Sequence, residues 1–367
     1  MSTQKRAIFT IIGGTIGVGF LALPYSIYKF GVLYGLAVIV LVAILTVIIN
    51  LAYADIITFD KGNRQIPGYI RKYFGGIPSH FITIIIITGL IGILFAYGLV
   101  SGNILKILLS YFGLHLSSNF LGLIFVIFSI LVSRYGIKFI SKVSTFTVVI
   151  LIFAIIILVS ISIPRIDTSN FSNLNFKYFP LLFGVSIFSL YSAGSIPVID
   201  EIIGYNIKNY KRAIIIAGII TLIIYVIFSL VLALSFGQRL TSELIGCFGK
   251  EYFISSILLS ILTLIAIFTC FCLVANNIKE ILHYDYKLPS KVSFLFIFSI
   301  LTWLLAFDIF SFEQILSKVG NFSLVIQNLG ILALWFKLKA NKRTSIVSIV
   351  IIMISALILI GGMVINI

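Results

Sequence analysis

Apolar runs long enough to cross a membrane recur along the whole chain, and no other feature of the sequence constrains the fold as strongly. A helix of about 20 apolar residues spans the ~30 Å of hydrocarbon in a bilayer. Of the 367 residues, 60% are hydrophobic and only 10% are charged, which leaves too few charges to cover a soluble surface. The sequence therefore predicts an all-α integral membrane protein, in which residues 1–367 form a single membrane domain.

The apolar runs divide into eleven expected transmembrane helices, whose boundaries are loose by a few residues. They are residues 7–28, 32–58, 80–111, 116–133, 143–163, 178–203, 211–236, 252–282, 292–307, 310–336 and 344–365. An odd number of spans places the two termini on opposite sides of the membrane.

The basic residues indicate which side the N-terminus occupies. With the N-terminus inside, 19 of the 26 Lys and Arg residues fall in cytoplasmic segments and 7 fall outside, as the positive-inside rule requires. We therefore expect a cytoplasmic N-terminus and an external C-terminus. The net charge of +15 comes from these short clusters, so it does not indicate a nucleic-acid partner. The frequent Ile, Asn and Lys are typical of an AT-rich prokaryotic genome, for which the plasma membrane is the expected location.

Two of the spans contain stretches that a helix tolerates poorly. Span 1 has the run Gly13–Gly19 at its middle, and span 6 has Ser189–Pro197. Glycine weakens a helix and Pro197 removes a backbone donor. In hydrocarbon, an unwound backbone persists only where it lines a cavity or is buried in protein. Small residues also let helices pack closely, as in the G-x-x-x-G pattern of Gly98 and Gly102, but matching breaks in both halves favour a binding site.

The two breaks lie five spans apart, which is the spacing of two inverted five-helix repeats. The repeats would cover about residues 7–163 and 178–336, with an extra helix at about 344–365. Each break creates one half-helix N-terminus with free N–H groups and one C-terminus with free carbonyls. The first suits a carboxylate, and the second suits an ammonium group or a cation. This pairing predicts a site for a zwitterionic amino acid near the middle of the membrane.

Five stretches carry a resemblance to a known group of transporters. In chain order they are Gly14–Pro24 followed by Gly31, Ala96–Gly102, Phe188–Tyr191 continuing to Pro197, Lys211–Ala213 leading to Gly218 and Tyr225, and Ala266–Phe271 running to Ile281. Together they resemble the amino acid/auxin permease group of the amino acid–polyamine–organocation superfamily, and most closely its hydroxy and aromatic amino acid permeases. The resemblance implies the leucine-transporter (LeuT) fold, with helices 1 and 6 discontinuous, and uptake of amino acids driven by an ion gradient.

The sequence departs from the pattern of these permeases at two places. Tyr191 stands where the aromatic permeases usually carry a histidine, which leaves the side chain of the substrate open. The pair Thr269-Cys270 replaces a Thr-Ser pair, and a thiol is a poorer ligand than a hydroxyl for a hard cation.

The resemblance assigns substrate contacts to both breaks and to span 3. Backbone N–H groups of the span 1 break would hold the carboxylate together with the hydroxyl of Tyr97, whose alternative role is that of an aromatic core residue. Carbonyls of the span 6 break would receive the ammonium group, beside small residues that border the side-chain pocket. The full expected set is Thr15, Ile16, Gly17, Val18, Gly19, Tyr97, Ser189, Leu190, Tyr191, Ser192, Ala193 and Gly194.

The coupling ion is expected to be a proton, with sodium as the alternative. A proton would use acidic residues inside a span, and Asp200 and Glu201 lie beyond the span 6 break. Their alternative role is to meet water at the cytoplasmic end of that span. A sodium ion would draw on the carbonyls near Gly13 and Ile16 and on the hydroxyl of Thr269.

Three charged residues are candidates for gates. Arg6 with Glu280 would close the cytoplasmic mouth. Lys318 lies about two turns into span 10 from the outer side. There it would snorkel outward, pair with Asp308 or Glu313, or serve as an outer gate.

These observations together favour a secondary transporter. We expect a proton-coupled symporter of neutral, hydrophobic or aromatic amino acids that works as a monomer by alternating access and needs no cofactor. The alternatives are a sodium-coupled symporter and an amino acid sensor or exchanger with the same fold, although the short tails around the spans disfavour a sensor. An enzyme is not expected, because the three histidines, His80, His115 and His283, share no metal-ligand spacing.

Overall fold

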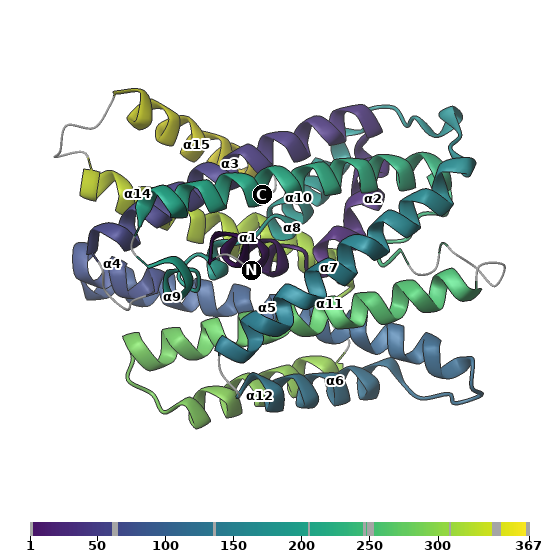
Figure 1. The fold of residues 1–367 in the computed structure, drawn as a ribbon, viewed down its shortest axis with the longest axis horizontal. Coiled ribbons are helices and arrows are strands. Elements are labelled where there is room, and N and C mark those ends of the chain that lie inside the picture. Colours follow the sequence, from purple (N-terminus) through teal and green to yellow (C-terminus); the bar gives the residue numbers. More distant parts are fainter. Residues whose placement is uncertain are drawn as a thin grey trace.

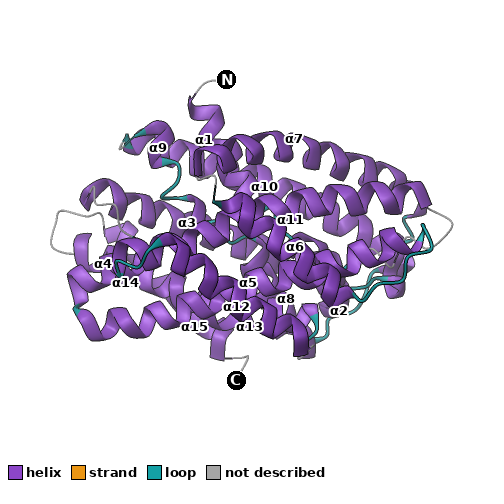
Figure 2. Ribbon diagram, turned by 90° about the horizontal axis from the view of Figure 1, so that it is seen from below, coloured by secondary structure: helices purple, strands orange, loops and turns teal. Residues whose placement is uncertain are grey.

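The chain folds into a bundle of long helices, which Figures 1 and 2 show from two directions. The structure is a computed structural model that describes residues 3–60, 65–134, 137–204, 206–244, 247, 253–307, 310–339 and 346–364. For residues 137–146, 200–201, 253–256, 258, 262 and 346–347, only the backbone is described. Every regular element within these ranges is a helix.

The helices follow the expected spans closely, and three spans are divided into shorter pieces. The α-helices are α1 (Thr3–Thr15), α2 (Gly19–Phe30), α3 (Val32–Asp60), α4 (Ile66–Phe74), α5 (Gly76–Ser110), α6 (Ser118–Ser133), α7 (Ile137–Ser162), α8 (Phe179–Ser189), α9 (Asp200–Ile203), α10 (Ile207–Phe236), α11 (Phe253–Glu280), α12 (Ser290–Phe307), α13 (Phe312–Lys318), α14 (Val325–Lys339) and α15 (Ile346–Val364). A π-helical segment, η9 (Val319–Leu324), joins α13 to α14.

The lengths and compositions of these elements support a multi-span membrane protein. Within the described residues, eight helical segments are each long and apolar enough to cross a membrane, and the bent pair of α1 and α2 makes a ninth. Two shorter apolar helices, α6 and α15, lie at the expected spans 116–133 and 344–365. The exact number of eleven spans stays a prediction, because it depends on these two short helices.

The break predicted in span 1 is confirmed. The α-helix stops at Thr15 and resumes at Gly19, and the two halves meet at an angle of 58°. At the break, the N–H of Gly17 donates to the carbonyl of Thr15 at 2.8 Å, which is a tight turn in place of the helical pattern.

The break predicted in span 6 is also confirmed, and it is the longer of the two. The α8 helix ends at Ser189, and α9 begins only at Asp200. Between them the backbone makes a short 3₁₀ turn over Ala193–Ser195. Pro197 lies in this interval and has no N–H with which to continue a helix.

The two breaks touch each other inside the bundle. A Cβ atom on Gly14 would lie 1.9 Å from the hydroxyl oxygen of Ser195, so a larger residue there would require the Ser195 side chain to move. Figure 1 shows α1 at the centre of the bundle, with α3 and α10 on one side of it and α5 and α11 on the other, and α2 packs against α8. The unwound segments are therefore enclosed by protein, as an unwound backbone in a membrane requires.

The G-x-x-x-G pattern of Gly98 and Gly102 serves helix packing, as predicted. A Cβ atom on Gly102 would lie 2.1 Å from the carbonyl oxygen of Ser118, at the start of α6. A Cβ atom on Gly122 of α6 would lie 2.6 Å from the carbonyl oxygen of Gly98. These glycines let α5 and α6 approach backbone to backbone.

The apolar runs predict only a connecting segment between spans 2 and 3, and the structure has a helix there. This helix, α4, carries Pro67 in its first turn, where a proline is tolerated, and ends at Gly75 with φ of 95°. Its first five residues are buried and its last four are not. The apolar-run criterion misses α4 because the helix is short and amphipathic.

Asp55 ties three spans together at the end of the bundle where α3 finishes. Its carboxylate lies 3.0 Å from the ammonium of Lys211 on α10 and 3.7 Å from that of Lys339 on α14. The indole N–H of Trp335, also on α14, donates to the same carboxylate at 3.1 Å.

We predict that Asp55→Ala lowers the free energy of unfolding by about 1–3 kcal/mol, because it removes the acceptor of a buried indole N–H and an anionic neighbour of two ammonium groups. Thermal unfolding of the purified protein in detergent measures this. The two ammonium groups are partly exposed, so part of the difference should shrink at high salt. An unchanged unfolding temperature at low salt would contradict the prediction.

Candidate substrate and ion site

The N-terminus of α2 offers free backbone donors, as the span 1 break predicts. Val18 precedes the helix, and no side chain caps its first N–H groups. A Cβ atom on Gly19 would lie 2.9 Å from the Cα atom of Ser189, the last residue of α8. The donors expected for the substrate carboxylate therefore lie directly against the carbonyl end expected for its ammonium group.

Tyr97 reaches the same point from α5. Its hydroxyl lies so close to Gly17 that a Cβ atom there would be 2.6 Å from the oxygen. The side chain is buried, with 4% of its surface exposed. Tyr97 is thus an aromatic core residue that also presents its hydroxyl to the span 1 break, and its contact with a substrate carboxylate stays a prediction.

Tyr225 of α10 holds the two broken helices together, a contact that the sequence analysis does not foresee. Its hydroxyl lies 3.2 Å from the carbonyl oxygen of Thr15 and 3.1 Å from that of Ser189. These carbonyls end α1 and α8. One hydroxyl hydrogen is shared between two acceptors. The Thr15 carbonyl also accepts from the Gly17 N–H, whereas the Ser189 carbonyl keeps a lone pair for another donor.

The hydroxyls of the span 6 break are already engaged. Ser189 donates to the carbonyl of Val185 one turn earlier at 2.7 Å. Ser192 accepts a hydrogen bond of 2.7 Å from the side-chain amide of Asn50 on α3. Asn50 thus fixes the unwound segment to a neighbouring span, a role that its place in an apolar run does not reveal.

Tyr191 points into a polar cluster formed with side chains of α11 and α14. Its hydroxyl accepts a hydrogen bond of 3.1 Å from Gln327 of α14 and also bonds with Asn277 of α11. An adjoining cavity of about 10 Å³ is lined by the same two amides and by Tyr53. The Tyr53 hydroxyl and the Gln327 carbonyl oxygen have no partner among the described residues, and the space is about that of one water molecule.

The carbonyls of the expected cation site are bonded to a thiol. Cys270 of α11 lies with its Sγ atom 3.1 Å from the carbonyl oxygen of Gly13 and 3.4 Å from that of Ile16. The Thr269 hydroxyl donates to the carbonyl of Ala266 on its own helix at 2.9 Å and also contacts the Cys270 thiol.

These residues do not fit a sodium ion. A hard cation needs about six oxygen ligands in a shell around it, whereas here the Cys270 thiol lies against the two carbonyls in the place where a hydroxyl oxygen would complete such a shell. A thiol is a soft ligand and would add little to sodium binding.

The remaining candidates divide into three cases. The side chains of Asp200 and Glu201 lie outside the described part of the structure, so their coupling role stays a prediction. The carboxylate of Glu280 accepts hydrogen bonds of 2.7 Å from Gln65 and from Asn276. Within the described residues Arg6 is not among its partners, so the structure does not bring the expected inner gate together.

Lys318 does not join the proposed centre. Its ammonium lies 4.4 Å from the centroid of the Phe310 ring, over a cavity on another side of α13. Asp308, one of its two expected partners, lies outside the described residues. The other, Glu313, forms a side-chain hydrogen bond with Tyr25.

A small cavity borders the unwound segments in this conformation. It lies between α1, α3 and α10, is lined by Thr15, Asn50 and Ser192 among others, and has a volume of about 20 Å³. That volume holds a water molecule and nothing larger, so an amino acid could occupy this cavity only if the elements around it moved.

One acidic residue outside the spans, Glu243, is partly buried near the far end of α5. The Glu243 carboxylate, in the segment after α10, accepts a hydrogen bond of 2.7 Å from Asn103. Burial raises the pKa of Glu243, and the Asn103 hydrogen bond opposes this rise only in part.

We predict that Glu243→Gln stabilises the protein more at neutral pH than at acidic pH. Because the folded protein holds this proton more tightly than the unfolded chain, the stabilisation from protonation is fully present below the ordinary pKa of 4.5 and is lost as the pH rises through the raised folded value. Glutamine keeps an acceptor for Asn103 and carries no charge. Unfolding temperatures of both proteins measured across this range would contradict the prediction if their difference did not change with pH.

The sequence also matches a known protein family. Residues 4–246 match the model of the tryptophan/tyrosine permease family, well over half of the chain. The chain belongs to this family. Membership makes it an amino acid permease rather than an enzyme and agrees with the resemblance found in the sequence.

Two further proteins are similar to this permease over nearly its whole length. It is 26% identical over 337 residues to glutamine transporter 2 of Aliivibrio fischeri (strain ATCC 700601 / ES114). The aligned region covers 88% of the permease and 85% of that transporter. The crystal structure of MhsT in complex with L-phenylalanine matches with a TM-score of 0.76, covering 99% of the permease and 98% of MhsT at 14% identity. At that identity the likeness shows the fold alone, and it confirms the expected LeuT fold.

Proposed function

We propose that this permease is a proton-coupled symporter of neutral amino acids with hydrophobic or aromatic side chains. It would work as a monomer in the plasma membrane, with its N-terminus in the cytoplasm, by alternating access to one central site. The observation that carries the proposal is the meeting of the two half-helix ends, where the free N–H groups of α2 lie against the last carbonyl of α8.

The arrangement supports binding of a zwitterion. Of the N–H groups around Gly17, Val18 and Gly19, that of Gly17 already donates to the Thr15 carbonyl. The substrate carboxylate would therefore take those of Val18 and Gly19 together with the Tyr97 hydroxyl. The ammonium group would take the free lone pairs on the carbonyls of Ser189 and its neighbours, which Tyr225 already orients. The two halves bind opposite charges only when they are side by side, so substrate binding would also stabilise the closed arrangement of spans 1 and 6.

The preference for a proton over sodium rests on Cys270. Its thiol is bonded to the two carbonyls that a sodium ion would need. With those oxygens engaged, the driving ion would act elsewhere, and a proton needs only a titratable group that faces each side of the membrane in turn. Asp200 and Glu201 are the groups proposed for this role.

Uptake into proteoliposomes tests the proposal. Radiolabelled tryptophan, tyrosine, phenylalanine and glutamine would be supplied singly, with a proton gradient or a sodium gradient imposed separately. Glutamine belongs in the panel because the Aliivibrio fischeri relative is named for it. We expect a proton gradient alone to drive uptake of an aromatic amino acid.

Each other result would change the proposal in a defined way. Uptake that requires sodium would overturn the choice of ion. Uptake of glutamine but not of the aromatic amino acids would overturn the substrate class. Counterflow without net uptake under either gradient would make the chain an exchanger, and binding without any flux would make it a sensor.

A further inference from the structure

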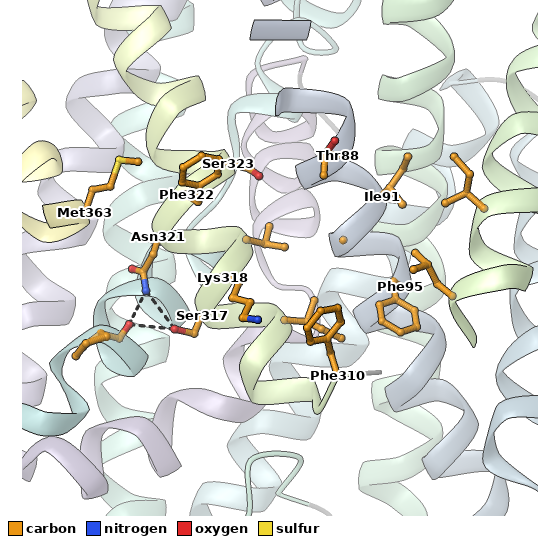
Figure 3. Close-up of a pocket in the computed structure, with 16 residues that line it drawn as sticks. Thr88, Ile91, Phe95, Phe310, Ser317, Lys318, Asn321, Phe322, Ser323 and Met363 are labelled. Atoms are coloured by element: carbon orange, nitrogen blue, oxygen red, sulfur yellow. Dashed lines mark hydrogen bonds between the residues drawn. The ribbon is translucent and has the colours of Figure 1, made fainter. Parts of the chain in front are cut away.

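A large cavity lies away from the central site, on the lateral face of the bundle. Its volume is about 760 Å³, within the range of about 300–1,000 Å³ that pockets for small molecules occupy. Figure 3 shows it between α5, which carries Thr88 and Phe95, and the segment of α13 and η9 that carries Lys318 and Phe322. Ile300 of α12 and Met363 of α15 close its flanks.

The cavity opens toward the bilayer. Phe322 at its edge is 51% exposed, and the neighbouring face of α12 exposes Trp303 and Phe307 by 57% and 59%. Large exposed aromatic and aliphatic side chains on a transmembrane helix face lipid. Lipid molecules of the membrane, rather than water, therefore have access to the cavity.

One positive charge lies in this otherwise largely apolar space. Lys318 is six residues from the start of α13, which places it about 9 Å along the helix from that end. Figure 3 shows its side chain directed toward Phe310 and away from Asn321, and the ammonium lies over the Phe310 ring. Within the described residues no carboxylate forms an ion pair with it, so a cation lies at the depth of the membrane interface facing an apolar cavity.

The part of span 10 that forms the wall of the cavity also packs against the first half of the broken span 6. A Cβ atom on Gly320 of η9 would lie 1.9 Å from the carbonyl oxygen of Gly184 on α8. The Asn321 amide donates to the carbonyl of Pro180 at 2.8 Å, and Ser317 donates to the same carbonyl at 3.3 Å, as Figure 3 shows. A molecule in the cavity would therefore press on the segment that holds the half-helix before the break.

We propose that this cavity binds an anionic phospholipid, with an acyl chain between α5, α12 and η9 and the phosphate of its headgroup on Lys318. The occupant must combine a long apolar part with a negative charge near the membrane interface, because that is what the cavity and the ammonium offer together. Of the molecules in a bilayer, an anionic phospholipid has this combination. The site is separate from the amino acid centre and does not depend on the coupling ion or the substrate.

Lipid retention by the purified permease tests this proposal. The probes are phosphatidylglycerol and phosphatidylcholine with identical acyl chains, added to the detergent-purified protein and counted by native mass spectrometry. We expect the wild type to retain one phosphatidylglycerol in preference to phosphatidylcholine, and Lys318→Gln to lose roughly fivefold of that preference, the effect of one basic residue near a membrane surface. Lys106→Gln is the matched control, because Lys106 is an exposed lysine near the end of α5 that does not line the cavity.

A second variant separates the apolar part of the site from the charge. Thr88→Trp places a large side chain in the cavity, so it should reduce retention of both lipids while Lys318→Gln affects only the anionic one. The proposal is overturned if the wild type shows no preference, or if Lys106→Gln lowers it as much as Lys318→Gln does. Should Thr88→Trp not fold, the lysine pair still decides the outcome, and for a folded Thr88→Trp protein unchanged lipid retention also overturns the proposal.

Discussion

Tyr97→Phe should reduce substrate uptake by roughly ten- to a hundredfold, because a hydrogen bond to a charged group contributes about 1.5–3 kcal/mol and each 1.4 kcal/mol is a factor of ten in affinity. The Tyr97 hydroxyl lies against Gly17 at the start of the donor end of α2, where the carboxylate is proposed to bind. Phenylalanine keeps the ring in the core and removes only the hydroxyl. Uptake into proteoliposomes, with the concentration dependence measured, is the test.

The kinetic parameter that changes, and the ligands for which it changes, distinguish a loss of substrate binding from a change in the packing of the site. The weakening should appear as a higher substrate concentration for half-maximal uptake, and it should be specific for ligands that carry a carboxylate. The decarboxylated amine of the best substrate, used as a competing ligand, should bind the variant and the wild type equally. If the amine weakens as much as the amino acid does, the hydroxyl acts on the packing of the site and not on the carboxylate.

Tyr34→Phe is the matched control for this substitution. Tyr34 is on α3 and is 53% exposed, so removal of its hydroxyl should leave uptake unchanged. The unfolding temperature of Tyr97→Phe should stay close to that of the wild type. An uptake defect shared by both variants would contradict the role given to Tyr97.

The spans and the two breaks were accessible to sequence reasoning because they depend on local chemistry. The length of an apolar run can be counted directly in the sequence and compared with the thickness of the membrane. A cluster of glycine, serine and proline predicts a weak point in a helix wherever it occurs. The breaks at Ile16–Val18 and after Ser189 therefore lie where the residue types predict them. The short helix α4 was not accessible, since its turn chemistry and amphipathic pattern fall below the criterion that identifies a span.

The partners of the site residues were not accessible, because they come from distant parts of the chain. Tyr225 bonds to Thr15 across 210 residues, and Cys270 bonds to Gly13 across 257 residues. Both lie in stretches that carry the family resemblance, yet neither hydrophobic pattern nor spacing shows which backbone group each will meet. Asn50 was hidden for the same reason, as a lone amide inside an apolar run.

Charge alone was a poor guide to pairing. Arg6 and Glu280 are expected at the same mouth of the transporter, but the Glu280 carboxylate bonds to the amides of Gln65 and Asn276. Opposite charges at a similar depth in the membrane indicate only that two residues could form an ion pair. Which partner a carboxylate takes depends on the geometry of the connecting segments, here the chain just before α4, and that geometry is not readable from the positions of charged residues.

Cys270→Ser should make uptake responsive to sodium, whereas the wild type should be indifferent to it. In the wild type the thiol lies 3.1 Å from the Gly13 carbonyl oxygen and 3.4 Å from that of Ile16. A serine hydroxyl has a shorter bond to Cβ and a hard oxygen that coordinates sodium, so the variant would offer three oxygen ligands in place of two carbonyls bonded to a thiol. Initial uptake rates in sodium chloride and in potassium chloride, at equal ionic strength, measure the response.

Cys270→Ala and Cys272→Ser separate the possible causes of such a response. Alanine removes the group next to the two carbonyls and adds no ligand, which should lower the free energy of unfolding by about 1–3 kcal/mol without sodium stimulation. Cys272 is two residues away, buried, and directed at Ser129 instead of the span 1 break, so serine there should leave sodium dependence absent. Sodium stimulation of the wild type, or of Cys272→Ser as strongly as of Cys270→Ser, would show that the ion binds elsewhere and that the thiol does not decide the coupling ion.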